Sequence, residues 1–168
     1  DKAGVLEVFN CTLEEFTPRR LYDCVTLLDV LEHTRDPQAA IGKCATCLKP
    51  GGMLVVLTPD GGSVIRSSAV NAAKCVPGLS GALKYQYYRP HFCYVSARGL
   101  RRLAARNNLE IVRIERAATP RRFLAAKLRH HYAKYPGNVV LRAAISVAYP
   151  FMALWFGNKL LAFARKTV

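Results

Sequence analysis

Acidic side chains are scarce in this sequence. Only 11 of the 168 residues are Asp or Glu, against 25 Lys and Arg, so the formal net charge is +14. This excess predicts an acidic partner or surface, either phosphate groups, anionic lipid or nucleic acid, and does not choose among them. Hydrophobic residues make up 51% of the chain and charged residues 21%. That balance excludes a disordered chain and favours one globular domain.

A glycine-rich phosphate-binding loop is also missing. No GxGxxG-like run occurs in the 168 residues, and the pairs Gly51-Gly52 and Gly61-Gly62 are predicted to be turns. The sequence shows no secretory signal, so we expect a cytoplasmic location and six free thiols. Cys44-x-x-Cys47 has no second CxxC partner and falls within a predicted helix, which favours core residues over a metal or redox pair.

One stretch, residues 22–59, is predicted to form a strand, a helix and a second strand. Tyr22 to Leu28 is a near-continuous apolar run, as expected for a parallel strand buried on both faces. Asp36-Pro37 begins a helix, which Lys49-Pro50-Gly51-Gly52 ends, and Met53 to Leu57 forms the next buried strand. Ligands of open α/β sheets bind beyond the carboxyl ends of the strands. Those ends carry DVLEH (29–33) and TPDGGS (58–63).

These pieces carry a family resemblance. DVLEH after an apolar strand, then a helix, LKPGG, a second strand and TPDGGS resembles the class I S-adenosylmethionine-dependent methyltransferases, in particular the ubiquinone-biosynthesis O-methyltransferases and their relatives in cell-envelope glycan pathways. The resemblance implies an α/β fold with a partial Rossmann-like sheet, mostly parallel with an antiparallel last strand. We expect strands near 4–10, 21–28, 53–58, 109–115 and 159–165.

The resemblance also implies a function and a place in the family's domain. The chain matches the carboxyl-terminal two-thirds of a methyltransferase domain over residues 1–168, with a basic and apolar helical insertion at 117–157. Methyl transfer from S-adenosyl-L-methionine to an oxygen or nitrogen of a small acceptor is implied, the acceptor being a glycan, a lipid-linked sugar or a quinone-type phenol. Because the family's glycine loop is missing, we expect a fragment with weak or no cofactor binding by itself.

Two other functions stay open. A metal-dependent RNA methyltransferase is favoured by the net charge and by the set Asp29, Glu32, His33 and His91. A non-catalytic remnant or partner subunit is favoured by the missing glycine loop. Nucleic acid is the weaker partner, because the basic residues are not interleaved with aromatics as in known RNA-binding modules.

The resemblance assigns cofactor contacts to two segments. It places Cys11, Thr12 and Leu13 near the adenine ring, whereas Leu28 and Asp29 line the cofactor pocket. The residues themselves also allow a plain capped turn at 11–15, with Thr12 and Glu15 at capping-box spacing.

The DVLEH segment allows three interpretations. In the first, His33 faces the substrate as a general base, with His91 near the substrate mouth. In the second, Asp29, Glu32, His33 and His91 hold a divalent metal. In the third, the polar residues only cap the turn.

Contacts with the acceptor are expected from two further segments. Ser63 and Arg66 match a Ser and an Arg of the family, and Tyr87 and Tyr88 belong to a stretch where relatives place a substrate lid. The insertion at 117–157 could lie on the inner membrane surface, its basic stretch meeting anionic lipid. The internal Arg142 and Pro150 argue against a membrane-spanning helix.

Overall fold

The computed structural model describes residues 7–75, 90–117 and 157–167. Four strands and four helical segments lie within these ranges. In chain order they are β1 (Tyr22–Leu28), the 3-10 turn η1 (Leu31–His33), α1 (Pro37–Cys47), β2 (Leu48–Pro59), α2 (Val64–Cys75), α4 (Ala97–Ala105), β3 (Leu109–Ala117) and β4 (Lys159–Lys166).

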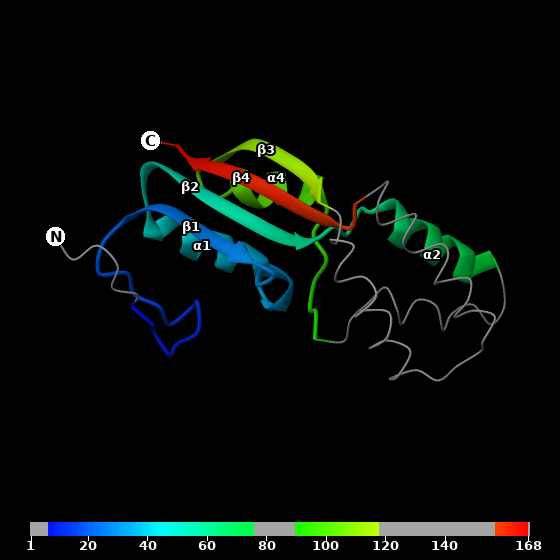
Figure 1. Cartoon of the computed structure of the whole chain (residues 1–168), viewed down its shortest axis with the longest axis horizontal. Coiled ribbons are helices and arrows are strands. Elements are labelled where there is room, and N and C mark those ends of the chain that lie inside the picture. Colours follow the sequence, from blue (N-terminus) through cyan, green and yellow to red (C-terminus); the bar gives the residue numbers. More distant parts are fainter. Residues whose placement is uncertain (1–6, 76–89, 118–156, 168) are drawn as a thin grey trace.

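The strands form one sheet in the order β1-β2-β4-β3 (Figure 1). β1 and β2 pair in parallel, whereas β4 runs antiparallel to both β2 and β3. Three strands therefore share one direction and the last strand opposes them. This confirms the predicted α/β fold with a mostly parallel sheet and an antiparallel last strand. The insertion expected at 117–157 lies outside the described residues except at its ends.

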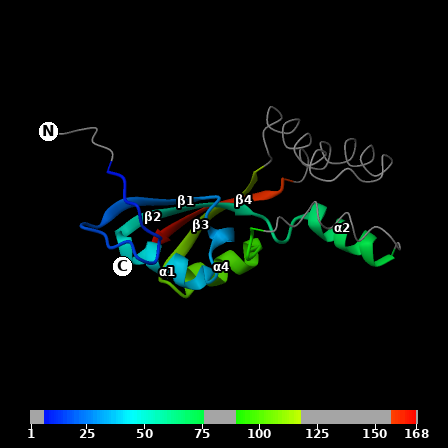
Figure 2. The same ribbon diagram turned by 90° about the horizontal axis from the view of Figure 1, so that it is seen from below.

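The core lies between the sheet and two helices that pack on the same face of it. Figure 2 shows α1 and α4 together beneath the sheet, and both helices contact one another. Buried residues alternate along the central strands, as in Leu54 and Val56 of β2 and Ala162 and Ala164 of β4. Ile41 comes from α1 to meet them. This alternation is the pattern of a sheet with one dry face.

The expectation that β1 is buried on both faces is wrong. Leu27 is 5% exposed, but its neighbour Leu28 is 56% exposed, and Cys24 is exposed as well. The reason is that α1 and α4 cover the same side of the sheet, so alternate side chains of β1 point to a face that no described helix covers. An apolar run alone does not tell how many faces a strand buries.

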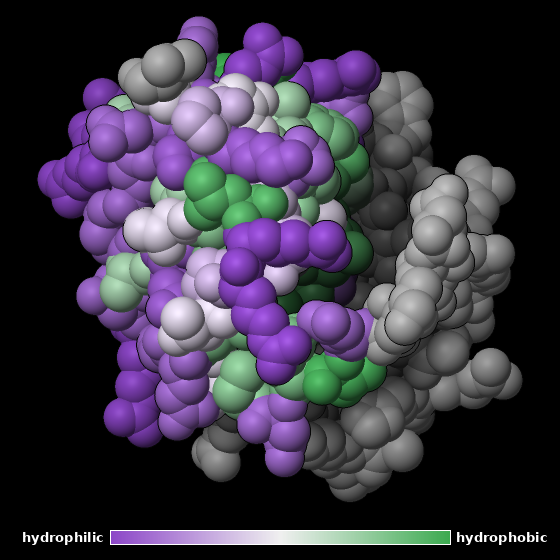
Figure 3. All heavy atoms as spheres, turned by 90° about the vertical axis from the view of Figure 1, so that its left-hand side faces the viewer, coloured by the Kyte–Doolittle hydropathy of each residue, from purple (hydrophilic) through white to green (hydrophobic). Residues whose placement is uncertain are grey.

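The strand expected at 4–10 is not found in its described part. Residues 7–10 form no strand, and Val8 is 82% exposed; residues 4–6 lie outside the described ranges. A strand needs a hydrogen-bonding neighbour, and this segment does not pair with β1. Figure 3 looks at the end of the molecule where β1 begins and shows hydrophobic side chains exposed among hydrophilic ones.

The turn between α1 and β2 is tighter than expected. Asp36 caps α1 by accepting hydrogen bonds from the N–H groups of Gln38 and Ala39, as predicted. β2 begins at Leu48 rather than at Met53, because Leu48 pairs with Tyr22 before a register shift in β1. Gly51 makes the bend possible, since its φ of +76° suits a residue without a side chain.

The two cysteines of the CxxC sequence lie in a helix and are buried, as the sequence predicts. All six cysteines are free, and Cys44 and Cys47 are buried in α1. Burial raises the pKa of the Cys44 thiol to about 12, so the reactive thiolate is scarce at neutral pH. The CxxC pair is therefore part of the core.

None of the helices in the described ranges is long and apolar enough to cross a membrane.

The cap of α1 gives a stability prediction. Asp36→Ala removes the acceptor for two backbone N–H groups, and we expect it to lower the free energy of unfolding by about 1 kcal/mol. Urea denaturation of both proteins measures the difference. Asp36→Asn retains an accepting oxygen and is the control. Equal stability of Asp36→Ala and the unmodified protein would show that this cap does not stabilise α1.

Candidate active site

Three segments meet at the carboxyl ends of β1 and β2. After β1, the N–H of Asp29 donates to the carbonyl of Leu57 at 2.8 Å, and its φ of +55° then turns the chain into η1. After β2, Asp60 pairs in parallel with Val95, directly before α4. Gly61 allows this approach, because a Cβ there would come within 2.5 Å of the Tyr94 carbonyl oxygen. The sheet thus places residues 29–33, 58–63 and 90–96 side by side.

Glu32 joins these three segments. Its side chain is 1% exposed, and its carboxylate accepts a hydrogen bond from the Thr58 hydroxyl at 2.9 Å. Its backbone carbonyl accepts from the N–H of Phe92 at 2.8 Å. A buried carboxylate is tolerated only with such partners. Glu32 therefore ties η1 both to the end of β2 and to the segment before α4.

Two histidines lie together beside Glu32. The rings of His33 and His91 meet edge to face, with centroids 4.7 Å apart and an interplanar angle of 80°. His33 is exposed, and its Nδ1 lies 3.1 Å from the carbonyl oxygen of Pro90. His91 is half-buried, and its Nδ1 lies 2.9 Å from the hydroxyl of Tyr94. One ligand atom from each of Glu32, His33 and His91 falls within 4.8 Å of the others.

The electrostatic surroundings keep His91 neutral. Burial lowers the pKa of His91 below its ordinary value, and the negative charge of Glu32 opposes this only in part. The lowered pKa lies further below neutral pH than that of an ordinary histidine, so the neutral imidazole is the main form near pH 7.

Asp60 and Arg66 form a second buried network behind Tyr94. The carboxylate of Asp60 accepts from the N–H of Gly62 at 2.8 Å and from Nε of Arg116 at 3.1 Å. The backbone carbonyl of Asp60 accepts from the guanidinium of Arg66. That guanidinium lies 4.3 Å from the centroid of the Tyr94 ring, a cation–π contact. The network fixes Tyr94 from its far side.

The residues expected to touch the acceptor have different settings. Ser63 is fully buried, and its hydroxyl accepts from the N–H of Arg66 at the start of α2. Arg66 is 9% exposed. Both side chains are thus buried, and Arg66 packs on the ring of Tyr94. Tyr87 and Tyr88 lie outside the described residues.

The residues expected to touch the cofactor are not brought together. Thr12 and Glu15 form the reciprocal capping box, at 3.0 and 3.3 Å, and Leu13 packs against the core while Cys11 is exposed. Figures 1 and 2 both place this segment beside the amino end of β1. Leu28 and Asp29 stand at the opposite end of the strand.

One functional neighbour was missed from the sequence. The carboxylate of Asp29 is bound by the ammonium of Lys159, 130 residues later in the chain. Lys159 begins β4, and no local pattern marks it. Because Asp29 turns to Lys159, it is absent from the Glu32, His33 and His91 group. The roles of Tyr94 and Thr58 were also missed, although both lie in segments that the sequence singled out.

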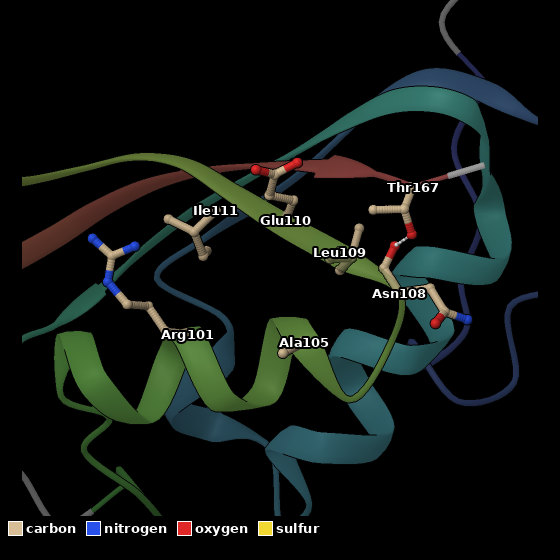
Figure 4. A pocket seen from close by; sticks show the side chains of 7 residues that line it. All are labelled: Arg101, Ala105, Asn108, Leu109, Glu110, Ile111 and Thr167. Atoms are coloured by element: carbon tan, nitrogen blue, oxygen red, sulfur yellow. Dashed lines mark hydrogen bonds between the residues drawn. The ribbon is translucent and has the colours of Figure 1, made fainter.

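A separate shallow groove of about 420 Å³ lies where α4 ends and β3 begins (Figure 4). Arg101 and Glu110 face it from the helix and the strand, and Thr167 donates to the carbonyl of Asn108 at its rim. Because α4 starts beside Asp60 and ends at this groove, the groove is at the far end of the helix from the histidines. It contains none of the residues that the sequence singled out.

Comparison with known proteins decides the family. A family model described as "Methyltransferase domain" matches residues 5–114, more than half of the chain. The chain belongs to this methyltransferase family. Glu32, His33, His91 and Tyr94 lie within the matched residues, whereas Arg116 and Lys159 lie beyond them.

Curated relatives of this methyltransferase chain match it over a short stretch. The ubiquinone biosynthesis O-methyltransferase of Bradyrhizobium sp. (strain ORS 278) is 47% identical over 51 residues, which are 30% of this chain and 20% of that enzyme. The Rhodopseudomonas palustris (strain HaA2) protein of the same name is 41% identical over 59 residues, covering 34% and 23%. The match thus spans only about a fifth of the length of these relatives.

Solved structures share the methyltransferase fold. A SAM-dependent methyltransferase from Archaeoglobus fulgidus is 15% identical with a TM-score of 0.54, covering 98% of this chain and 70% of that one. Magnesium protoporphyrin IX methyltransferase from Synechocystis PCC 6803, solved with bound SAH, is 14% identical with a TM-score of 0.52, covering 94% and 49%. At these identities the likeness concerns the fold.

The lowered pKa of His91 predicts a pH dependence of stability. A folded-state pKa below the unfolded value of about 6.5 stabilises the protein fully above that value. The contribution is lost as pH falls through the lower folded-state pKa. We expect the free energy of unfolding to decrease from pH 7 to pH 5, and His91→Gln to reduce that slope. Urea denaturation at each pH measures it.

Thr46→Ser on the exposed side of α1 is the control for this experiment, because it changes no titratable group. The prediction is contradicted if His91→Gln and the control show the same decrease of stability with falling pH.

Proposed function

We propose that the site at the carboxyl ends of β1 and β2 transfers a methyl group from S-adenosyl-L-methionine to an oxygen of a small phenolic acceptor, with His33 as the general base. Nitrogen acceptors, glycans and lipid-linked sugars belong to the wider class implied by the family resemblance. The family membership supports methyl transfer, and the base assignment rests on the contact between His33 and Pro90.

The contact with Pro90 determines which nitrogen of His33 can take a proton. A carbonyl oxygen only accepts hydrogen bonds, so Nδ1 of His33, 3.1 Å away, must carry the hydrogen. In the neutral ring the lone pair is then on Nε2. His33 is exposed at the mouth of the site, so an acceptor can reach this nitrogen.

The proposed reaction needs one base, which takes the proton of the acceptor hydroxyl. The bound cofactor supplies a methyl group on a positively charged sulfur. The methyl carbon would form its bond to the acceptor oxygen as its bond to sulfur breaks, and His33 would take the hydroxyl proton on Nε2. The products are the methyl ether, the neutral thioether and a protonated His33. The protein contributes mainly alignment of the two partners and removal of the proton.

An aromatic acceptor is supported by the surroundings of His33. Three hydrophobic side chains near the two histidines are exposed: Leu28 by 56%, Val30 by 39% and Phe92 by 63%. Leu28 and Val30 lie near the carboxyl end of β1, and Phe92 follows His91 in the sequence. The guanidinium of Arg35 lies 5.8 Å from the ring centroid of Phe92. Such apolar and aromatic side chains suit a flat ring better than a sugar. The names of the curated relatives, which are ubiquinone biosynthesis O-methyltransferases, point the same way.

Of the two segments expected to contact the cofactor, residues 28–29 lie next to His33 and residues 11–13 do not. Leu28 and Asp29 stand exposed at the strand end beside His33, where the cofactor of this proposal would lie. Cys11, Thr12 and Leu13 are at the other end of β1, so contact with the same cofactor molecule would need a different placement of their segment. Ser63 and Arg66, expected to contact the acceptor, are buried, and Arg66 packs on the ring of Tyr94. Contact of the chain with anionic lipid is supported by its net charge of +14.

The base assignment is tested with two substitutions of His33. In His33→Asn, the side-chain amide lies near the former position of Nδ1 and can still donate to the Pro90 carbonyl. In His33→Gln, the amide lies near the former position of Nε2. Neither can take the proton, so we expect both to lower methyl transfer to a soluble catechol roughly 100-fold or more. Transfer is measured with cofactor labelled in the methyl group.

A measurement of stability shows whether the His33→Asn variant is correctly folded. Because His33→Asn keeps the contact with Pro90, its free energy of unfolding should stay within about 0.5 kcal/mol of the unmodified protein. A folded His33→Asn variant that transfers methyl groups at the unmodified rate would overturn the assignment. Absence of transfer by the unmodified protein at every acceptor is expected both of a fragment that lacks the family's glycine loop and of a non-catalytic remnant or partner subunit.

A metal-dependent methyltransferase, acting on RNA or on a catechol, is the second candidate. It is favoured by the convergence of Glu32, His33 and His91, since a carboxylate and two imidazoles can bind Mn²⁺ or Zn²⁺. Asp29 would not take part, because it is bound to Lys159. The first candidate predicts that EDTA leaves the rate of methyl transfer unchanged. The second predicts loss of activity and recovery on adding Mn²⁺ or Zn²⁺.

A further inference from the structure

His33 and His91 are held by chemically unlike partners, although their rings touch. The partner of His33 is the carbonyl of Pro90, which can only accept a hydrogen bond. At Nδ1 of His91 the partner is the hydroxyl of Tyr94, 2.9 Å away, which can donate or accept. The tautomer of each ring follows from what its Nδ1 meets.

The direction of the hydrogen bond between Tyr94 and His91 follows from relative acidity and basicity. A neutral imidazole nitrogen is a better acceptor than a phenol oxygen, and a phenol hydroxyl is a better donor than a neutral imidazole N–H. This comparison applies to the neutral ring, the form in which the experiment below is made. The Tyr94 hydroxyl therefore donates to Nδ1 of His91.

Tyr94 is itself held in place for this contact. Its ring lies against the guanidinium of Arg66 at 4.3 Å. Arg66 is 9% exposed and donates to the backbone carbonyl of Asp60, a residue that is fully buried. The hydroxyl thus approaches His91 from a rigid support, as an orienting group should.

We infer that Tyr94 is a positioning residue that acts through His91: its hydroxyl places the proton of that ring on Nε2, while the Pro90 carbonyl gives His33 the opposite tautomer. The two neighbouring rings then offer different groups on Nε2. His33 presents a lone pair that can take a proton, and His91 presents an N–H that can donate a hydrogen bond to an oxygen of the acceptor. This division of roles rests on the proposed function, whereas the tautomers themselves do not.

The inference also describes what a metal ion at this site would change. A metal ion bound through Nε2 of both histidines needs a lone pair on each. That would require Tyr94 to accept a hydrogen bond from Nδ1–H of His91. Metal binding would therefore move the ring proton of His91 from Nε2 to Nδ1 and reverse its hydrogen bond with Tyr94.

The experiment is nuclear magnetic resonance of protein labelled with ¹⁵N in its histidines, at a pH where both rings are neutral. Nitrogen chemical shifts and couplings to the ring protons identify the protonated nitrogen. We expect the proton on Nδ1 of His33 and on Nε2 of His91. Tyr94→Phe keeps the ring on Arg66 but removes the hydroxyl, so the population of the Nδ1–H form of His91 should increase while His33 is unchanged.

Tyr22→Phe is the matched control. It removes the same hydroxyl from another tyrosine whose ring faces an arginine, with Arg20 at 5.9 Å from the centroid, but far from the histidines on β1. It should leave both tautomers unchanged. A proton on Nδ1 of His91 in the unmodified protein, or a His91 tautomer that does not respond to Tyr94→Phe, would overturn the inference.

Kinetics then test the division of roles separately. His91→Gln keeps an amide N–H near the position of Nε2, whereas His91→Asn moves it toward Nδ1. We expect His91→Gln to transfer methyl groups roughly tenfold faster than His91→Asn, the effect of one hydrogen bond. Equal rates, with the tautomers as inferred, would refute the donor role of His91, but neither the positioning by Tyr94 nor the proposed function, which the His33 variants test.

Discussion

The carboxylate of Glu32 lies buried where η1, the end of β2 and the segment before α4 meet. Removing a carboxylate from water costs several kcal/mol unless hydrogen bonds replace the water. Here the Thr58 hydroxyl binds the side chain, and the backbone carbonyl of the same residue holds Phe92. This one residue therefore fixes the relative positions of three loops that come from distant parts of the chain. The contact between His33 and His91 depends on it.

The sheet supplies the second constraint. β4 enters antiparallel between β2 and β3, so the start of the last strand reaches the edge at which the parallel strands end. That is why Lys159 can bind Asp29 and the carbonyl of Asn158 can accept from the N–H of Asp60. The carboxyl-terminal strand thus stabilises the loops of the site and also contributes Ala162 and Ala164 to the core between the sheet and its two helices.

Much of this arrangement could be predicted from the sequence, because the deciding signals are local. The Asp36-Pro37 helix start, the apolar strands and the acidic turn after β1 each lie within a few residues, and parallel strands bring their carboxyl ends together. The meeting of Glu32, His33 and His91 followed from the family resemblance. The missed features depend on the remainder of the fold. A strand pattern at 4–10 does not reveal whether a pairing partner exists, and an apolar β1 does not reveal that only one face is covered. The turn of Asp29 toward Lys159 joins residues 130 positions apart.

The central claim is that the methyl donor and the acceptor meet at the carboxyl ends of β1 and β2. The most direct test is to titrate S-adenosylhomocysteine, up to millimolar concentration, into ¹⁵N-labelled protein and record the backbone amide shifts. The account predicts weak binding, with the largest changes in residues 28–33 and 58–62. Changes centred on the groove between α4 and β3, or no change at any residue, would contradict it.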